Sequence, residues 1–394
     1  DINETVIKAI KKGSINIQEL YKGVHIGKVA QDLIKNAKLS VYNNYNRQNS
    51  DPSVFIITVG IADQEDGSHD ISPLSNLLDT ILPSLVDEDL LIFRTTMIPG
   101  TCNNFIAPII KSLNKKIYLA YSPETILETR AFEELENNVR ILAGLDDESY
   151  NKAAIFLKSL SHSKIEKASD ILTAEMVKVV QNITRDVDIS LINELSEISS
   201  HLGVDIYELR KLVNTHPRIE LLLPGPGVGG YCLPNALKYL EGALEKDTSL
   251  PLTLMQTARK LNEKRPQEIV KIVKDALKKE GKSLKKSKIA MVGLAMKDYC
   301  ADCRYSPAIE IASQLIIEGA KIYAFDSLVS PPYPYQVKSF EECIKNADCL
   351  LITAKQFNMI FDVDEIIKLM KQPTIVVDTR NVFPIDTRIL LYRT

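Results

Sequence analysis

The chain of 394 residues is long enough to form two or three domains, and its 45% apolar and 25% charged residues indicate an ordinary globular protein with an ample core. A net charge of −3 gives no reason to expect nucleic acid or an anionic membrane surface as partner. No apolar run approaches the roughly 20 residues of a membrane span. Six scattered cysteines indicate a reduced, cytoplasmic setting. Cys300 and Cys303 have C-x-x-C spacing, but no second pair or histidine cluster accompanies them, so we expect no metal site.

The first third of the chain alternates β-rich apolar runs with amphipathic segments. Strands that alternate with helices at this spacing predict a parallel sheet. We expect buried strands at 54–59, 90–96, 116–121 and 140–143, and helices near 74–86, 101–113 and 150–160.

Polar residues follow two of these strands, at the carboxyl edge of the sheet where ligands bind in such folds. Thr96 lies after one strand, and Glu124 lies after the next, with Glu128 further on. Each could instead belong to a turn or a helix cap.

From 173 to about 203 the hydrophobic period changes to 3.6 and predicts one long helix. Its polar stripe consists of Lys178, Asn182 and Arg185, and would be either a solvated face or a catalytic one. The catalytic alternative is open because Lys and Asn four residues apart can polarise a reacting oxygen from two sides. The opposite stripe is apolar and consists of Met176, Val179, Val180, Ile183 and Val187. A second helical stretch runs from Pro251 to Lys279, and we expect Pro266 to kink it.

The segment from Pro224 to Pro234 is too rich in glycine and proline for a helix or a central strand. Such a loop lets backbone approach a ligand, and it places Cys232 near its end as a candidate nucleophile. A buried turn with a core cysteine is the alternative. The G-x-G-x-x-G pattern at 225–230 does not predict a dinucleotide loop, because Pro226 lacks the N–H that a pyrophosphate needs and no strand follows the next helix.

The lysine-rich segment 281–288 marks a boundary before a second α/β unit. Lys297 and Arg304 follow its first strand and would suit a phosphate. Ser306 and Pro307 are expected as N-cap and first residue of a helix. The predicted strands are 288–294, 321–326, 349–354 and 374–378, and the predicted helices are 307–319, 340–347 and 363–370. We therefore expect an α/β protein with two Rossmann-like parallel-sheet domains, 1–168 and 285–394, joined by a central helical and dimerisation region, 169–284.

Taken in chain order, these pieces resemble the UDP-glucose/GDP-mannose dehydrogenase family over nearly the whole sequence. The motif series is Asp1-Ile2-Asn3, Thr96 to Thr101, Ser122-Pro123-Glu124, Ala174 to Lys178 with Asn182, His216-Pro217-Arg218, the Gly-Gly-x-Cys loop, Gly293 to Lys297 with Asp302, Arg304 and Ser306, and Asp378 to Asn381. The segments 216–218 and 224–230 look like the branch of the family that oxidises UDP-N-acetylhexosamines, most often UDP-N-acetylmannosamine.

The resemblance implies a four-electron oxidation of the sugar C6 alcohol to a carboxylate with NAD, for surface polysaccharide precursors, by a homodimer or larger homo-oligomer. It implies that Cys232 forms a thiohemiacetal and then a thioester. Lys178 and Asn182 would stabilise the oxyanions, and Glu124 with Thr96 would position the hydrolytic water. The implied cofactor contacts are Asp1, Thr96, Glu124 and Arg304, and the implied UDP-sugar contacts are Arg185, His216, Arg218, Gly229, Tyr231 and Lys297.

Three departures from the family pattern keep other interpretations open. Where the family has an Asp four residues after the nucleophile, this chain has Ala236, and where the family has Pro-Thr-Pro after the strand at 54–59, it has Gly-Ile-Ala at 60–62. The glycine loop expected before Asp1 is absent, so we expect about 30 further residues upstream. A nucleotide-sugar-binding pseudoenzyme remains an alternative. A two-electron hydroxyacid dehydrogenase is another, although it would need no loop cysteine. The acetamido-sugar epimer is not specified by the sequence.

Overall fold

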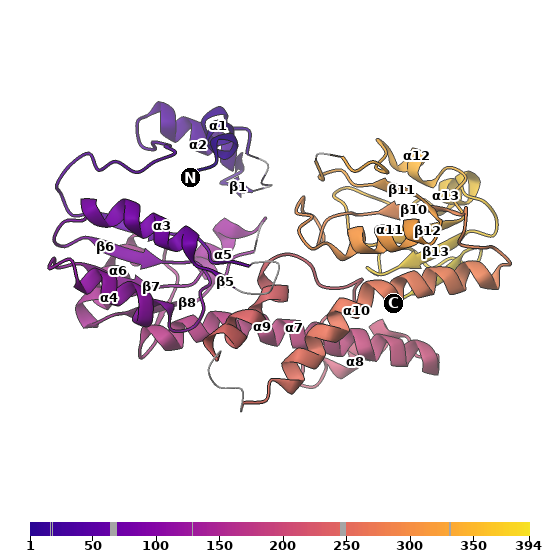
Figure 1. Cartoon of the computed structure of the whole chain (residues 1–394). Coiled ribbons are helices and arrows are strands. Elements are labelled where there is room, and N and C mark those ends of the chain that lie inside the picture. The colour runs from indigo at the N-terminus through magenta and orange to yellow at the C-terminus, as the bar shows by residue number, and fades with distance from the viewer. Residues whose placement is uncertain (16, 18, 64–68, 128, 245–249, 331) are drawn as a thin grey trace. The chain divides into compact units, whose positions relative to one another are not determined.

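The computed structural model describes residues 1–394 except 16, 18, 64–68, 128, 245–249 and 331 (Figure 1). The chain divides into two compact units, and each contains a five-stranded sheet. The first unit comprises residues 1–181 and 235–250, and the second comprises 182–234 and 251–394. Among the described residues, no helix has the length and apolar character needed to cross a membrane.

The sheet of the first unit has the order β3-β6-β7-β8-β9. The predicted parallel pairing is confirmed for the first three strands, whereas β8 runs antiparallel to β7. Helix α6 (Asp147–Leu160) covers one face, where Ala153 and Leu157 pack against Ile92 and Ala120. The strands are β3 (Val54–Ile57), β6 (Leu90–Phe93), β7 (Tyr118–Tyr121), β8 (Arg140–Gly144) and β9 (Ile165–Lys167).

The prediction that the strand beginning at Val54 is buried was wrong. β3 lies at an end of the described sheet and pairs with β6 alone. The side chains of Val54 and Ile56 are 40% and 44% exposed. A continuous apolar run favours a strand covered on both faces, but the burial depends on packing neighbours that the run does not encode.

Several short elements of the first unit were not predicted, because two-residue strands and ten-residue helices leave little periodicity to detect. These are α1 (Glu4–Lys12), the hairpin β1 (Leu20–Tyr21) and β2 (Val24–His25), α2 (Ile26–Lys35), the hairpin β4 (Ala62–Asp63) and β5 (His69–Asp70), α5 (Ala131–Asn137), and β9. The helix expected at 74–86 is α3 (Ser72–Ile81), which a 3₁₀ turn (Leu82–Ser84) follows. The helix expected at 101–113 consists of a π-helical turn (Cys102–Ile106) and α4 (Ala107–Lys111).

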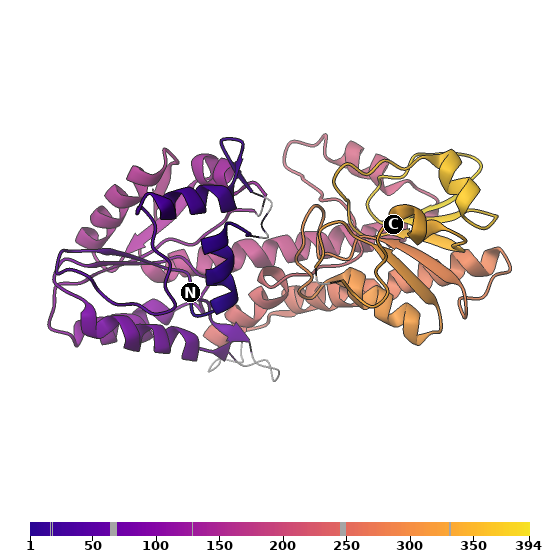
Figure 2. The ribbon, with the colours of Figure 1, turned by 90° about the horizontal axis from the view of Figure 1, so that it is seen from above.

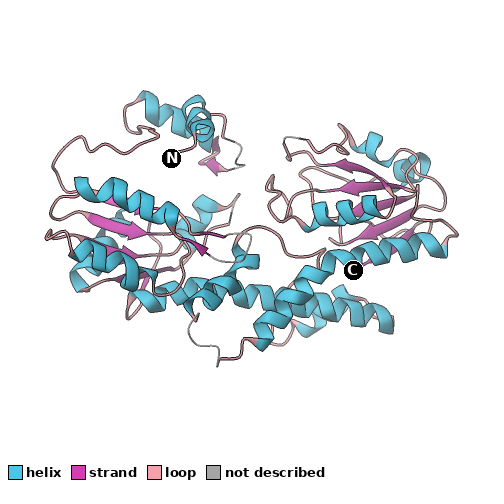
Figure 3. Ribbon diagram, in the orientation of Figure 1, coloured by secondary structure: helices cyan, strands magenta, loops and turns pink. Residues whose placement is uncertain are grey.

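The second unit has a fully parallel sheet of order β11-β10-β12-β13-β14, with helices on both faces (Figure 3). Val273 of α10 (Thr253–Lys279) and Ile311 of α11 pack on one face, while Ile344 of α12 and Ile366 of α13 pack on the other. This arrangement confirms the expected Rossmann-like α/β fold; β14 was not predicted. The elements are β10 (Lys288–Val292), α11 (Pro307–Ile317), β11 (Lys321–Phe325), α12 (Phe340–Ile344), β12 (Cys349–Ile352), α13 (Val363–Leu369), β13 (Ile375–Asp378) and β14 (Leu390–Arg393).

The central segment is helical, as predicted. Helix α7 (Ile171–Leu202) is a single uninterrupted helix (Figure 2), and α8 (Ile206–Val213), α9 (Cys232–Ala243) and α10 (Thr253–Lys279) follow. Helix α10 continues through Pro266 without a break.

Ser306 occupies the N-cap position of α11, as expected, but its side chain does not cap the helix. Its hydroxyl instead donates to the carbonyl of Leu294 at 2.7 Å, which ties α11 to the loop after β10.

Candidate active site

The thiol of Cys232 is solvent-exposed and belongs to the first residue of α9, where the glycine-rich loop ends. The free N–H groups at a helix N-terminus favour an anion there, and a thiolate benefits in the same way. Of the other five cysteines, four are buried and Cys303 is half-buried. The structure thus singles out Cys232 as the accessible thiol.

The glycines before Cys232 allow the loop to pack tightly against the segment that follows β10. A Cβ added to Gly229 would lie 2.6 Å from the carbonyl oxygen of Tyr305, and one added to Gly230 would lie 2.3 Å from the Met296 sulfur. The Gly230 N–H also donates to the Arg304 carbonyl at 2.8 Å. Gly230 has φ of 79°, which favours glycine as well.

The start of the same loop is held through the backbone of Gly225. Its N–H donates to Oδ1 of Asn193 on α7 at 2.9 Å, and its carbonyl accepts from Nε of Arg265 on α10 at 3.0 Å. Arg265 is only 2% exposed. Nearby, Arg380 forms an ion pair with Asp298 at 2.7 Å. Sequence reasoning missed Asn193, Arg265 and this ion pair, because their partners are distant in sequence.

The polar stripe of α7 is not a single solvated face. Asn182 is buried, at 8% exposure, and its Nδ2 has no hydrogen-bond partner among the described residues. Lys178 is half-buried, whereas Arg185 is exposed. The predicted apolar stripe also needs correction, since Val180 is 45% exposed. A buried amide donor without a partner is the kind of group that a ligand oxygen satisfies.

Thr96 and Glu124 lie at one edge of the first unit's sheet, because they follow the neighbouring parallel strands β6 and β7 by three residues. Glu124 pairs with Arg94, whose side chain is 9% exposed and which sequence reasoning missed. Oε1 of Glu124 also accepts from the Thr125 N–H at 2.9 Å. The Thr96 hydroxyl makes no hydrogen bond to a described residue. Glu128 lies outside the described residues.

The expected cofactor residues lie in both units. The Asp1 carboxylate accepts the Asn3 N–H at 2.8 Å and is exposed. Arg304 pairs with Asp302 at 2.5 Å, so this guanidinium is already engaged. Thr96 and Glu124 both lie just beyond strand ends, at the carboxyl edge of the sheet, where ligands bind in folds of this kind.

The remaining expected substrate residues belong to the second unit. His216 and Arg218 are exposed after α8, with Nε2 and Nη2 3.4 Å apart. Lys297 is half-buried after β10, and Tyr231 directly precedes the nucleophile.

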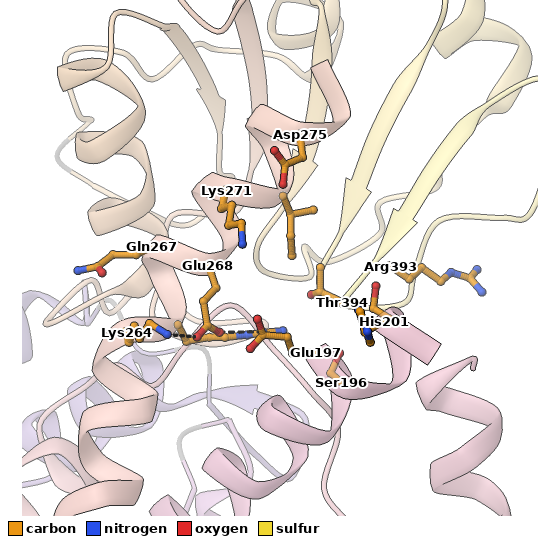
Figure 4. Close-up of a pocket in the computed structure, with 13 residues that line it drawn as sticks. Ser196, Glu197, His201, Lys264, Gln267, Glu268, Lys271, Asp275, Arg393 and Thr394 are labelled. Carbon is orange, nitrogen blue, oxygen red and sulfur yellow. Dashed lines mark hydrogen bonds and ion pairs between the residues drawn. The ribbon is translucent and has the colours of Figure 1, made fainter. Parts of the chain in front are cut away.

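A cavity of about 560 Å³ lies between the C-terminal part of α7, α10 and the end of β14 (Figure 4). None of the predicted site residues lines it. Four basic and three carboxylate side chains nearly balance in its lining, so the lining does not favour a ligand of one charge. These residues are Lys264, Arg265, Lys271, Arg393, Glu197, Glu268 and Asp275.

Comparison with known proteins identifies the family. The UDP-glucose/GDP-mannose dehydrogenase models match at residues 1–159 for the NAD-binding domain, 172–264 for the central domain and 290–385 for the UDP-binding domain. The chain is 33% identical over 391 residues to a UDP-N-acetyl-D-mannosamine dehydrogenase of Methanococcus maripaludis, an alignment that covers 97% of this chain and 86% of the relative.

Two solved structures are also similar. That of UDP-D-ManNAc dehydrogenase from Pyrococcus horikoshii matches with a TM-score of 0.87 and 28% identity, covering 100% of this chain and 92% of that one. That of the UDP-N-acetyl-mannosamine dehydrogenase Cap5O from Staphylococcus aureus matches with a TM-score of 0.85 and 30% identity, covering 100% and 91%. The chain therefore belongs to the UDP-glucose/GDP-mannose dehydrogenase family of NAD-dependent nucleotide-sugar dehydrogenases.

Proposed function

We propose that this protein oxidises the C6 hydroxyl of a UDP-N-acetylhexosamine, first of all UDP-N-acetylmannosamine, to the uronate. The observation that carries the proposal is the exposed Cys232 thiol at the first residue of α9. Cys232 directly follows the glycine-rich loop, which is hydrogen-bonded to α7 and α10. The names of the relatives support the acetamido sugar as substrate class. The product would serve as a precursor for surface polysaccharide. Because all six cysteines are free thiols, we propose the cytoplasm as its location.

The chemistry divides into two oxidations and a hydrolysis. NAD⁺, when bound, accepts the hydride in each oxidation. Lys178 and Asn182 donate hydrogen bonds to the alkoxide as the alcohol becomes an aldehyde. The Cys232 thiolate adds to the aldehyde carbon, and loss of a second hydride from the thiohemiacetal leaves a thioester. A water held by Glu124 and Thr96 attacks this thioester, releasing the carboxylate and the thiol.

The other predicted residues have binding roles in this proposal. Asp1, Thr96, Glu124 and Arg304 are the cofactor contacts, and Arg185, His216, Arg218, Gly229, Tyr231 and Lys297 are the UDP-sugar contacts. We retain three domains with the proposed bounds 1–168, 169–284 and 285–394.

NADH formation with a panel of UDP-sugars tests the proposed reaction. We expect two NADH per UDP-N-acetylmannosamine consumed, with slower turnover of its epimers and of UDP-glucose. One NADH per sugar would instead favour a two-electron dehydrogenase. No turnover with any sugar, despite binding, would favour the pseudoenzyme.

We also propose that the working form is a homodimer, or a larger homo-oligomer, built on α7. Leu191, Ile198 and Leu202 are 45%, 49% and 69% exposed. Their spacings of seven and four residues place them on one face of the helix. An apolar stripe of this kind on a long helix fits a second copy of the same helix, and in such a dimer Arg218 would reach the partner's substrate.

Mixing two inactive variants tests whether Arg218 acts across the dimer. Random exchange of Cys232→Ser and Arg218→Ala subunits makes about half of the dimers mixed. In each mixed dimer, one of the two sites carries both the native Cys232 and the native Arg218. Activity should therefore recover to about a quarter of wild type. NADH formation is the measurement, and mass spectrometry of the intact mixed dimer verifies exchange. Confirmed exchange without recovery would place Arg218 in its own subunit's site or away from the substrate.

The pseudoenzyme alternative rests on Ala236, which is completely buried. Its neighbour Asn235 has a buried Nδ2 without a partner among the described residues. If the native chain hydrolyses its thioester slowly, Ala236→Asp should speed this step, because a carboxylate can position the attacking water. The buried charge should lower the melting temperature. Intact-mass trapping of the Cys232 adduct in a single turnover gives the hydrolysis rate, and Ala236→Asn is the uncharged control. An adduct equally short-lived in the native chain and Ala236→Asp would assign the role to Asn235 or Glu128.

A further inference from the structure

A carboxylate in the second turn of α7 is buried against the loop that carries Thr96. Glu175 is 0% exposed, and its two oxygens accept the backbone N–H groups of Gly100 at 2.6 Å and Cys102 at 2.9 Å. These amides belong to the turn that opens the helical segment 102–111. The N-cap residue of that segment, Thr101, makes no side-chain cap. Glu175 therefore caps this helical segment from a distant part of the sequence.

No cation balances this charge within the part of the chain that the structure describes. Burial raises the pKa of Glu175, and the two amide hydrogen bonds act in the opposite direction. The same burial, together with the nearby Glu175 carboxylate, raises the pKa of the Cys102 thiol well above its usual range. The Cys102 thiol is a further hydrogen-bond partner of Glu175. Burying a carboxylate costs free energy, and these hydrogen bonds offset part of that cost.

The loop between β6 and the helical segment is fixed at both ends. At its start, the Tyr121 hydroxyl donates to the Thr95 carbonyl at 3.0 Å. At its end, the Thr101 N–H donates to the Ile98 carbonyl at 3.0 Å, and Glu175 accepts the N–H groups of the residues on either side, Gly100 and Cys102. Lys178 lies three residues after Glu175, on a neighbouring position of the same helix.

We propose that Glu175 is a positioning residue that sets the Thr96 loop at a fixed place relative to Lys178. It performs no chemical step and touches neither substrate nor cofactor. The inference rests on the proposed function, in which Thr96 helps to place the hydrolytic water and Lys178 stabilises the oxyanions. Both groups and Glu175 belong to the first compact unit.

The test replaces Glu175 by Gln, which keeps one acceptor oxygen but turns an N–H₂ group toward the second backbone N–H. Hydrogen–deuterium exchange should become faster in the peptide that spans 96–106. Turnover of UDP-N-acetylmannosamine should fall by about 10- to 100-fold in kcat, the range for a misplacement near 1 Å. The KM for the sugar should stay within about twofold, because the sugar-binding Lys297 and Arg218 belong to the other unit.

Glu197→Gln is the matched control, because it makes the same change at an exposed position of the same helix, away from the stripe of Leu191, Ile198 and Leu202. It should alter neither exchange nor kcat. If Glu175→Gln does not fold, Glu175→Asp, which keeps the charge but shortens the reach, should show the same two effects more weakly. Unchanged exchange at 96–106 would overturn the cap, and faster exchange with wild-type kcat would overturn the positioning role. If the wild type oxidises no UDP-sugar, the proposed function fails while the exchange result still decides the cap.

Discussion

Cys232→Ser is expected to abolish net acid formation while leaving UDP-sugar binding nearly intact. A serine hydroxyl is far less nucleophilic toward an aldehyde than a thiolate at a helix N-terminus, and it cannot form the thioester. The side chains differ little in size at this exposed position, so the fold should persist. Product analysis by mass spectrometry measures uronate, and calorimetric titration measures binding of the UDP-sugar.

Cys303→Ser is the matched control for this prediction. Cys303 is half-buried in the second unit, and burial raises its pKa to about 11, so it provides little thiolate at neutral pH. The control should keep wild-type turnover. Undiminished acid formation by Cys232→Ser would contradict the thioester mechanism and direct the search to another nucleophile.

The position of Cys232 could be predicted from the sequence because its signal is local. Glycine and proline predict the loop that begins at Pro224, but its expected end at Pro234 was wrong, because α9 already begins at Cys232 and includes Pro234 in its first turn. Four of the five strands of the C-terminal sheet were predictable for the same reason, since their apolar runs lie between clear turn residues. By contrast, β14 is half-buried along its length, and its four residues, Leu-Leu-Tyr-Arg, show no alternation that would distinguish it from a loop.

The burial of Asn182 could not be predicted, because helical periodicity assumes that buried faces are apolar. The buried face of α7 is largely polar beyond Ile183: Asp186 pairs with Arg259 of α10 at 2.8 Å and also accepts from Asn262 at 2.9 Å. Further buried polar residues of this face are Ser190, Asn193, Ser196 and Ser199. Asp186 can be buried because its partners lie on α10, about 70 residues away, and a local pattern does not reveal such partners.

Lys178→Ala is expected to lower kcat by about 10²–10³, the range for removal of one oxyanion donor. Lys178 is half-buried on α7, where its ammonium would meet the alkoxide in the first oxidation and the tetrahedral oxyanions later. Because these charges develop only during reaction, kcat should fall more than the KM for the sugar rises. Steady-state NADH formation provides both constants.

Asn182→Ala should reduce kcat less than Lys178→Ala, because the amide is a neutral donor. It should also cost little stability, since the buried Nδ2 has no partner to lose among the described residues. Gln181→Ala, an exposed change on the same helix, is the control and should alter neither quantity. Thermal unfolding separates catalysis from structure: wild-type kcat in both variants, together with lower melting temperatures, would make Lys178 and Asn182 structural residues. A loss of kcat at an unchanged melting temperature would instead identify them as the donors that stabilise the oxyanions.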